Sequence, residues 1–84
     1  MNVKVSFSEK KDNDGKIVGF IADFTAEEGT YNSTSSSEVG FDSPVDSIDG
    51  KEVLKKLDLT SIIKSLKDDL VNKGANITKL TISL

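Results

Sequence analysis

The chain has 84 residues, of which 11 are lysine and 14 are Asp or Glu, and it contains no Arg, His, Cys, Trp or Gln. One domain, 1–84, with a thin core is expected at this length, because small domains bury only about 60–65% of their unfolded surface. The missing residue types exclude disulfides, thiolate chemistry, a side chain that titrates near neutrality, and the bidentate donor that phosphate and guanine favour. The sequence therefore predicts a protein that is not an enzyme, holds no cofactor or metal and binds no nucleic acid directly.

No segment of the sequence has the pattern of a targeting or membrane-spanning segment. Residues 1–7 alternate apolar and polar side chains, which is typical of a strand and not of a signal peptide. No run approaches the roughly 18 apolar residues that a transmembrane helix needs. We therefore expect a cytoplasmic protein that does not associate with membranes.

Two alternating segments flank a turn that is rich in Asp and Gly. Residues 3–7 and 18–24 each place apolar side chains on one face of an extended chain. Asp14 and Gly15 are a strong hairpin signal, because both central positions of a tight turn tolerate positive φ. This turn places Asn13 opposite Lys16, Phe7 opposite Ala22 and Val5 opposite Phe24. The sequence therefore predicts an N-terminal β-hairpin with both apolar sets on the same face.

Residues 25–50 differ from the hairpin because Ser, Thr and acidic side chains dominate them. They are typical of an acidic Ser/Thr-rich loop or a partly extended segment within the domain. Val39 and Phe41 alternate and predict a short third strand over 38–42, which Pro44 ends. Structureless loops longer than about 15 residues are uncommon in compact domains, so we expect part of this segment to join the sheet.

From residue 51 the apolar period changes to three and four residues, which predicts a main amphipathic helix. Its apolar positions are Val53, Leu54, Leu57, Leu59, Ile62, Ile63, Leu66 and Leu70. Asp58 and Thr60 are both candidate N-caps, so a helix broken near 58–60 is an open alternative to a continuous one. Alternation over 78–84 then predicts a C-terminal strand.

This order of elements predicts an α+β fold in which a single helical layer packs on one sheet. A connection through a helix is right-handed and usually returns a strand parallel to an earlier one. We therefore expect the last strand to pair parallel to the first.

Charge is distributed unevenly along the chain. Residues 21–50 hold seven acidic side chains and no basic one, while the segments on either side are slightly basic. Blocks of one sign often form interaction surfaces, because their field steers partners of opposite charge; the alternative is a mobile loop that is acidic only to stay solvated. The candidate partner-binding residues are Glu27, Glu28, Tyr31, Glu38, Phe41, Asp42, Asp46 and Asp49.

These residues predict a small acidic, non-enzymatic module that binds a protein with a basic surface. Tyr31 and Phe41 would be apolar anchors, since exposed aromatic residues tend to carry interface energy. The specific hypothesis is an inhibitor or immunity-type protein that blocks the basic, nucleic-acid-binding surface of its partner.

Two short motifs resemble functional sites but lack residues that those sites require. Residues 12–17 resemble the middle of an EF-hand loop, but Lys10 and Ile21 occupy the first and twelfth positions, where acidic ligands are required. Ser61 and Lys64 match an S-x-x-K spacing, but the further motifs of the enzymes that use it are absent. Neither pattern supports a metal or catalytic site.

The C-terminal strand provides the alternative function. Residues 76–84 carry only Lys79 as a charge. A strand of this kind at a sheet edge can pair with another chain, so a self-associating structural or accessory subunit, such as a homodimer joined through 76–84, stays open. The other interpretation is that the strand lies between neighbours and its apolar face is core.

Overall fold

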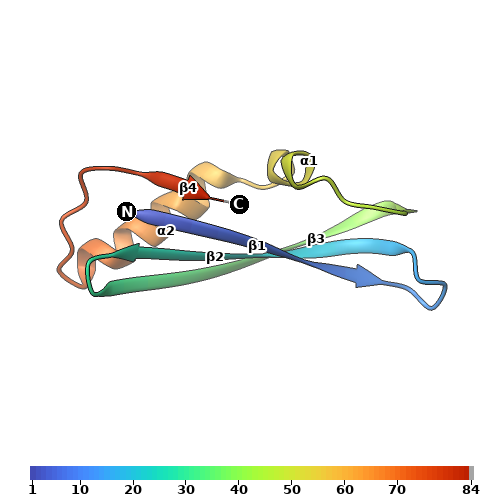
Figure 1. Cartoon of the computed structure of the whole chain (residues 1–84), viewed down its shortest axis with the longest axis horizontal. Helices are drawn as coiled ribbons and strands as arrows, with labels where there is room; N and C mark the ends of the chain where they lie inside the picture. The colour runs from blue at the N-terminus through green and yellow to red at the C-terminus, as the bar shows by residue number, and fades with distance from the viewer. Residues whose placement is uncertain (84) are drawn as a thin grey trace.

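The computed structural model describes residues 1–83 and contains one mixed sheet and two helices. Strands β1 (Asn2–Lys11), β2 (Ile17–Glu28) and β3 (Tyr31–Val45) form an antiparallel meander. Helices α1 (Gly50–Lys55) and α2 (Leu59–Asn72) follow, and β4 (Thr81–Ser83) pairs parallel to β1. The sheet order is β3-β2-β1-β4 (Figure 1). The predicted α+β class and the parallel return of the last strand are confirmed.

The turn between β1 and β2 differs from the predicted one by a residue. The backbone N–H of Asp12 donates to the carbonyl of Lys16 at 2.9 Å, so Asp12 and not Asn13 faces Lys16. Gly15, with φ of 79°, ends a three-residue loop in the left-handed conformation that glycine favours. A register shift between Lys10 and Lys11, next to the turn, compensates for the extra residue. As predicted, Phe7 faces Ala22 and Val5 faces Phe24.

Strand β3 is much longer than the predicted short strand over 38–42. A two-residue turn joins it directly to β2; Gly29 has φ of 60° and Thr30 has no positive φ, as in a type II′ turn. On the face that α2 covers, β3 carries Ser33, Ser35 and Ser37 opposite apolar residues of β2. Because serine is small, the helix can lie close to this strand. Residues 25–28 and 31–45 are thus extended.

The predicted helix is broken near 58–60, which was one of the two alternatives, and Asp58 rather than Thr60 is the N-cap after the break. The carboxylate of Asp49 accepts the backbone N–H of Lys51 at 2.9 Å at the start of α1. The carboxylate of Asp58 accepts the backbone N–H of Ser61 at 3.2 Å at the start of α2. Both acids satisfy helix donors that would otherwise lack a partner.

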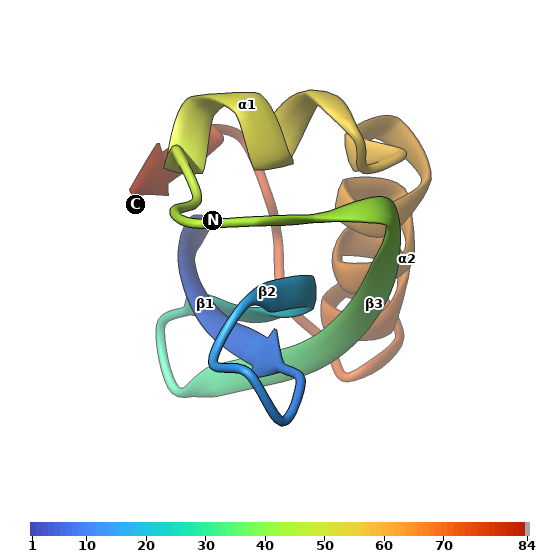
Figure 2. The same ribbon diagram turned by 90° about the vertical axis from the view of Figure 1, so that its right-hand side faces the viewer.

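Both helices pack on one face of the twisted sheet (Figure 2). The buried core consists of Met1, Val3, Val5, Phe20, Ala22, Phe24, Ala26, Val53, Leu66 and Leu70. The other face carries mainly polar side chains, among them Lys4, Ser6, Thr34 and Ser36. Within residues 1–83, no helix or strand covers that polar face. The hydrophobic layer is therefore single, as expected for a chain of this size.

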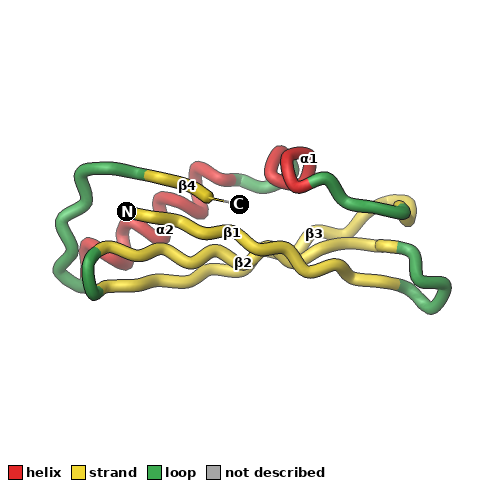
Figure 3. The backbone as a smooth tube through the Cα atoms, viewed as in Figure 1, coloured by secondary structure: helices red, strands yellow, loops and turns green. Residues whose placement is uncertain are grey.

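The molecule is elongated, with principal extents of 47 × 19 × 17 Å. The β2–β3 turn and the end of α2 lie at one end, and the three-stranded ribbon β1-β2-β3 continues past α1 towards the other (Figure 3). Over the described residues, neither helix has the length and apolar character needed to cross a membrane.

Candidate functional site

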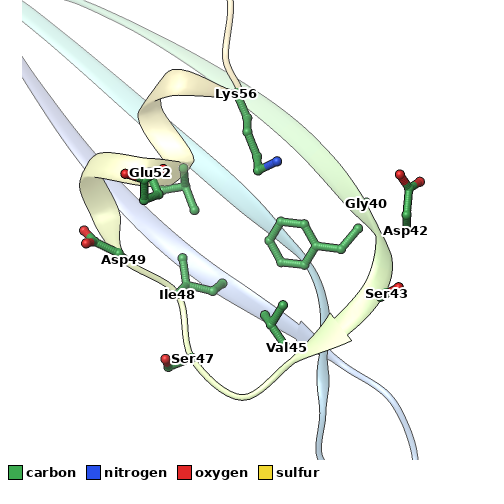
Figure 4. A pocket seen from close by; sticks show the side chains of 11 residues that line it. Gly40, Asp42, Ser43, Val45, Ser47, Ile48, Asp49, Glu52 and Lys56 are labelled. Atoms are coloured by element: carbon green, nitrogen blue, oxygen red, sulfur yellow. The ribbon is translucent and has the colours of Figure 1, made fainter.

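An open cleft of about 420 Å³ lies between the end of β3 and α1 (Figure 4). Its apolar surface comes from Phe41, Val45, Ile48 and Val53. Its polar lining includes Asp42, Asp49, Glu52 and Lys56. Of the residues predicted to bind a partner, the structure brings Phe41, Asp42 and Asp49 together around this hollow.

The base of the cleft rests on a row of aromatic rings that crosses the sheet. Phe20 packs edge-on against Phe7, with ring centroids 6.0 Å apart, and its ring is tilted against that of Phe41 at 5.7 Å. Phe20 is fully buried, and Val53 of α1 closes the layer above the sheet. Phe41 is therefore held in place by the core and is only half-buried.

Charged groups surround this apolar centre. Asp49 lies at one side of the cleft, whereas the Asp42 side chain lies on the outer side of β3 and points away from the Phe41 ring (Figure 4). The Lys56 ammonium lies 5.9 Å from the centroid of that ring. Asp49 is fixed as the N-cap of α1, and Glu52 pairs with Lys55 at 3.2 Å. Among residues 1–83, Asp42 forms no ion pair. The arrangement is an apolar hollow with a charged, mainly acidic rim.

The other predicted partner-binding residues lie elsewhere. Glu27, Glu28 and Tyr31 flank the β2–β3 turn at the opposite end of β3. Tyr31 is 39% exposed, and its hydroxyl packs beside Gly74, next to the end of α2. At about 3.3 Å per residue, the ten residue steps from Tyr31 to Phe41 separate the Cα atoms of these two residues by roughly 33 Å. The predicted aromatic anchors therefore do not form one surface.

Several acids of the negative block are paired with bases from distant parts of the chain. Glu38 pairs with Lys10, Asp46 with Lys16, and Glu28 with the N-terminal amine at 3.4 Å. The β-sheet creates the first two pairs by setting β3 and the segment after it near the turn of the β1–β2 hairpin. The field of the block is therefore weaker than the sequence alone indicates.

Among residues 1–83, two carboxyl groups have perturbed pKa values; one is at the N-cap of α2 and the other is near its C-terminal end, and neither is in the cleft. The hydroxyl and the backbone N–H of Ser61 lower the pKa of Asp58. The hydroxyl of Ser33 and the ammonium of Lys73 lower the pKa of Asp69. In both cases local hydrogen bonds stabilise the ionised form, which is the pattern of helix caps and helix–strand contacts.

The two sheet edges are formed by β4 and β3. Of residues 76–84, which the self-association alternative uses, only Thr81–Ser83 form an edge strand; residues 76–80 lie outside any strand, and residue 84 lies outside the described residues. Ile82 in β4 is 44% exposed, and Leu80 just before β4 is 47% exposed. Whether β4 pairs with another chain stays a prediction.

Sequence reasoning did not find Val45, Ile48, Glu52, Val53 or Lys56 as part of this site. The available signal was the pair of apolar residues on either side of residues 46–47, followed at once by the apolar positions of α1. Over residues 1–83, no three acidic side chains gather as a metal site would require. No protein-family model, curated protein or solved structure compared with this chain matches it.

Proposed function

We propose that the chain is a non-enzymatic protein-binding module whose cleft receives a Lys- or Arg-bearing segment of a partner protein. The observation that carries this proposal is the combination of an apolar hollow, formed by Phe41, Val45 and Ile48, with the acidic residues Asp49 and Glu52 on its α1 side. Long basic side chains have an aliphatic stem and a charged head. Such a side chain can bury its stem in the hollow while its head stays near the acidic rim.

The cleft resembles an ordinary protein interface in its distribution of polarity. Interfaces tend to have an apolar, desolvated centre and a polar rim, and their energy concentrates at the centre. Here Phe41 supplies the centre, and Asp49 and Glu52 supply the rim, while Asp42 adds its charge on the outer side of β3. The rim charges steer a basic partner and weaken in effect as salt increases.

The inhibitor or immunity-type role is the more specific form of this proposal. A module of this kind would cover a basic, nucleic-acid-binding surface of its partner and release it at high ionic strength. The net charge of −3 supports an attraction of this sign. The cytoplasmic location expected from the sequence belongs to the same proposal.

The test compares two triple variants that lose the same charge. D42N/D49N/E52Q neutralises the cleft, and the side-chain amide that replaces the Asp49 carboxylate can still cap α1; E9Q/D14N/D68N removes three exposed acids elsewhere. In an NMR titration with acetyl-arginine amide, we expect shifts at Phe41, Ile48 and Val53 in the wild type and the control but not in the cleft variant. Shifts outside the cleft, or shifts that persist in the cleft variant, would overturn the proposal.

Self-association through β4 is the second candidate function. It is favoured by the position of β4 at a sheet edge, where its backbone could pair with an added strand, and by the exposure of Ile82 in β4 and of Leu80 just before it. It predicts an assembly that is insensitive to salt, because apolar contacts and backbone hydrogen bonds would hold it. Sedimentation at low and high salt separates it from the cleft proposal.

A further inference from the structure

The direction of the backbone groups along β3 can be assigned from one contact. The ammonium of Lys73 donates to the carbonyl oxygen of Asn32 at 2.7 Å, so this carbonyl points away from β2. In an antiparallel strand, successive residues direct their backbone groups to alternate sides. Thr34, Ser36 and Glu38 therefore direct their N–H and C=O groups to the free edge of the sheet. Among residues 1–83, no backbone group outside the sheet bonds to them.

Apart from Lys73 at the Asn32 carbonyl, the edge between Asn32 and Glu38 lacks the protection that natural sheets usually have. Exposed edges are normally short, or are blocked by Lys, Pro or a bulge, because unpaired strands recruit other strands. Residues 31–37 contain no charged residue and no proline, and Thr34 and Ser36 are exposed. Lys73 covers the carbonyl of Asn32 alone. In contrast, the strand at the opposite edge, β4, has only three described residues.

We propose that β3 pairs antiparallel with β3 of a second copy about a twofold axis at Ser35. The two four-stranded sheets then form one continuous sheet of eight strands. In this register Thr34 lies opposite Ser36 of the second copy, and Glu38 lies opposite Asn32 of the second copy. This inference is independent of the cleft, which is lined by Gly40 and later residues.

Charge identifies the second copy as the occupant. Antiparallel pairing about a twofold axis places each edge residue against a residue of the same strand. The uncharged middle of β3 then meets itself without repulsion. Glu38, which pairs with Lys10, and Lys73, which pairs with Asp69, have opposite signs and flank this stretch of β3. The twofold axis brings each close to the other in the second copy. Asp23 accepts a hydrogen bond from the Ser36 hydroxyl on the polar face of the sheet. A different partner strand that carried only acidic or only basic side chains would form an attractive contact with only one of Glu38 and Lys73.

The first test uses proline at matched edge positions. Because the N–H of Ser36 points outward, S36P removes an edge donor without breaking a bond to β2. We expect the wild type and S36A to form a concentration-dependent dimer in sedimentation experiments, and S36P to remain monomeric with a similar melting temperature. A wild type that is monomeric at every concentration would overturn the proposal.

The matched variant at the opposite edge is I82P. The N–H of Thr81 bonds to the carbonyl of Met1 at 2.9 Å, so Ile82 directs its N–H away from β1. We expect I82P to dimerise like the wild type. Loss of the dimer in I82P but not in S36P would place the contact at β4 and contradict the proposal. The cleft variant D42N/D49N/E52Q should still dimerise, which separates a failure here from a failure of the proposed function.

The register is tested by cross-linking, which is simple because the chain has no cysteine. T34C and S36C lie opposite each other across the proposed axis. A mixture of the two variants should form a disulfide-linked heterodimer in preference to either homodimer. Preferential T34C or S36C homodimers would show that the axis lies elsewhere and would contradict this register.

Discussion

The Lys73 ammonium, one residue beyond α2, lies 2.7 Å from the carbonyl oxygen of Asn32 in β3. The same ammonium lies 2.9 Å from the carboxylate of Asp69, one helical turn earlier. Asp69 in turn is beside the hydroxyl of Ser33, and Ser33 as a residue is only 7% exposed. Together these polar contacts join the end of α2 to the start of β3, where no large apolar side chain of β3 contributes to the buried core.

We expect K73M to loosen this junction while retaining most of the side-chain stem. A hydrogen bond from a half-exposed charged donor contributes about 0.5–1 kcal/mol to stability. Chemical denaturation should therefore show a small loss in the free energy of unfolding, and amide exchange should rise near residues 31–33. K64M, which removes an exposed lysine from α2 but not from the junction, is the control. Equal exchange in both variants would show that the contact does not hold the strand.

Substitutions at two adjacent residues of α2 can separate the stability that comes from core packing from the stability that comes from helix propensity. Leu70 is fully buried, whereas Val71 is 47% exposed. We expect L70A to cost roughly 2–5 kcal/mol, because it leaves a cavity in a single-layer core. We expect V71A to change stability by less than about 0.5 kcal/mol. Denaturant titrations followed by circular dichroism measure both. Similar losses in the two variants would contradict the packing of α2.

The acid stability of α2 depends on its N-cap. Because the Ser61 hydroxyl and backbone N–H lower the pKa of Asp58 in the folded state, its ionised form stabilises the fold above the pKa of the unfolded chain. That stabilisation is lost as the pH falls through the lower folded pKa. We expect D58N, which retains an acceptor, to show a smaller drop in melting temperature between neutral and acidic pH than the wild type. Parallel pH curves would contradict this role.

Most of the fold could be predicted from the sequence, because in the hairpin and in α2 the spacing of apolar residues and the turn or cap residues indicate the same element. The hairpin pairs Val5 with Phe24 as expected, and Leu66 and Leu70 are buried as the helical spacing indicates. The one-residue error at Asp12 arises because an Asp-Gly pair is compatible with both two-residue and three-residue loops. Only tertiary pairing decides between these loops.

The length of β3 could not be predicted from apolar alternation. Its inner residues, including Ser33 and Ser37, are small and polar, and β2 supplies the apolar contacts of this part of the sheet. Likewise, the pairing of Glu38 with Lys10 spans 28 residues of sequence and exists only once the sheet has formed. The cleft could not be predicted for the same reason: its two walls, the end of β3 and α1, lie side by side only in the folded chain.

Gly19 and Gly40 face each other across β2 and β3, and they differ in what surrounds them. A Cβ atom on Gly19 would lie 2.4 Å from the carbonyl oxygen of Val39, whereas a Cβ on Gly40 would meet nothing within 4 Å. Because the obstacle at Gly19 is backbone, the two strands must separate to accept a side chain. We expect G19A to cost about 1–3 kcal/mol, as overpacking usually does.

G40A is the matched control, because it adds the same methyl group to the opposing strand. Since glycine within a strand costs roughly 0.5–1 kcal/mol in chain entropy relative to alanine, we expect G40A to be neutral or slightly stabilising. Thermal and denaturant unfolding of both variants measure the difference. A G19A protein as stable as G40A would show that β2 and β3 do not approach as closely at this point as the structure indicates. The base of the cleft, which follows Gly40 directly in β3, would then be wider than described.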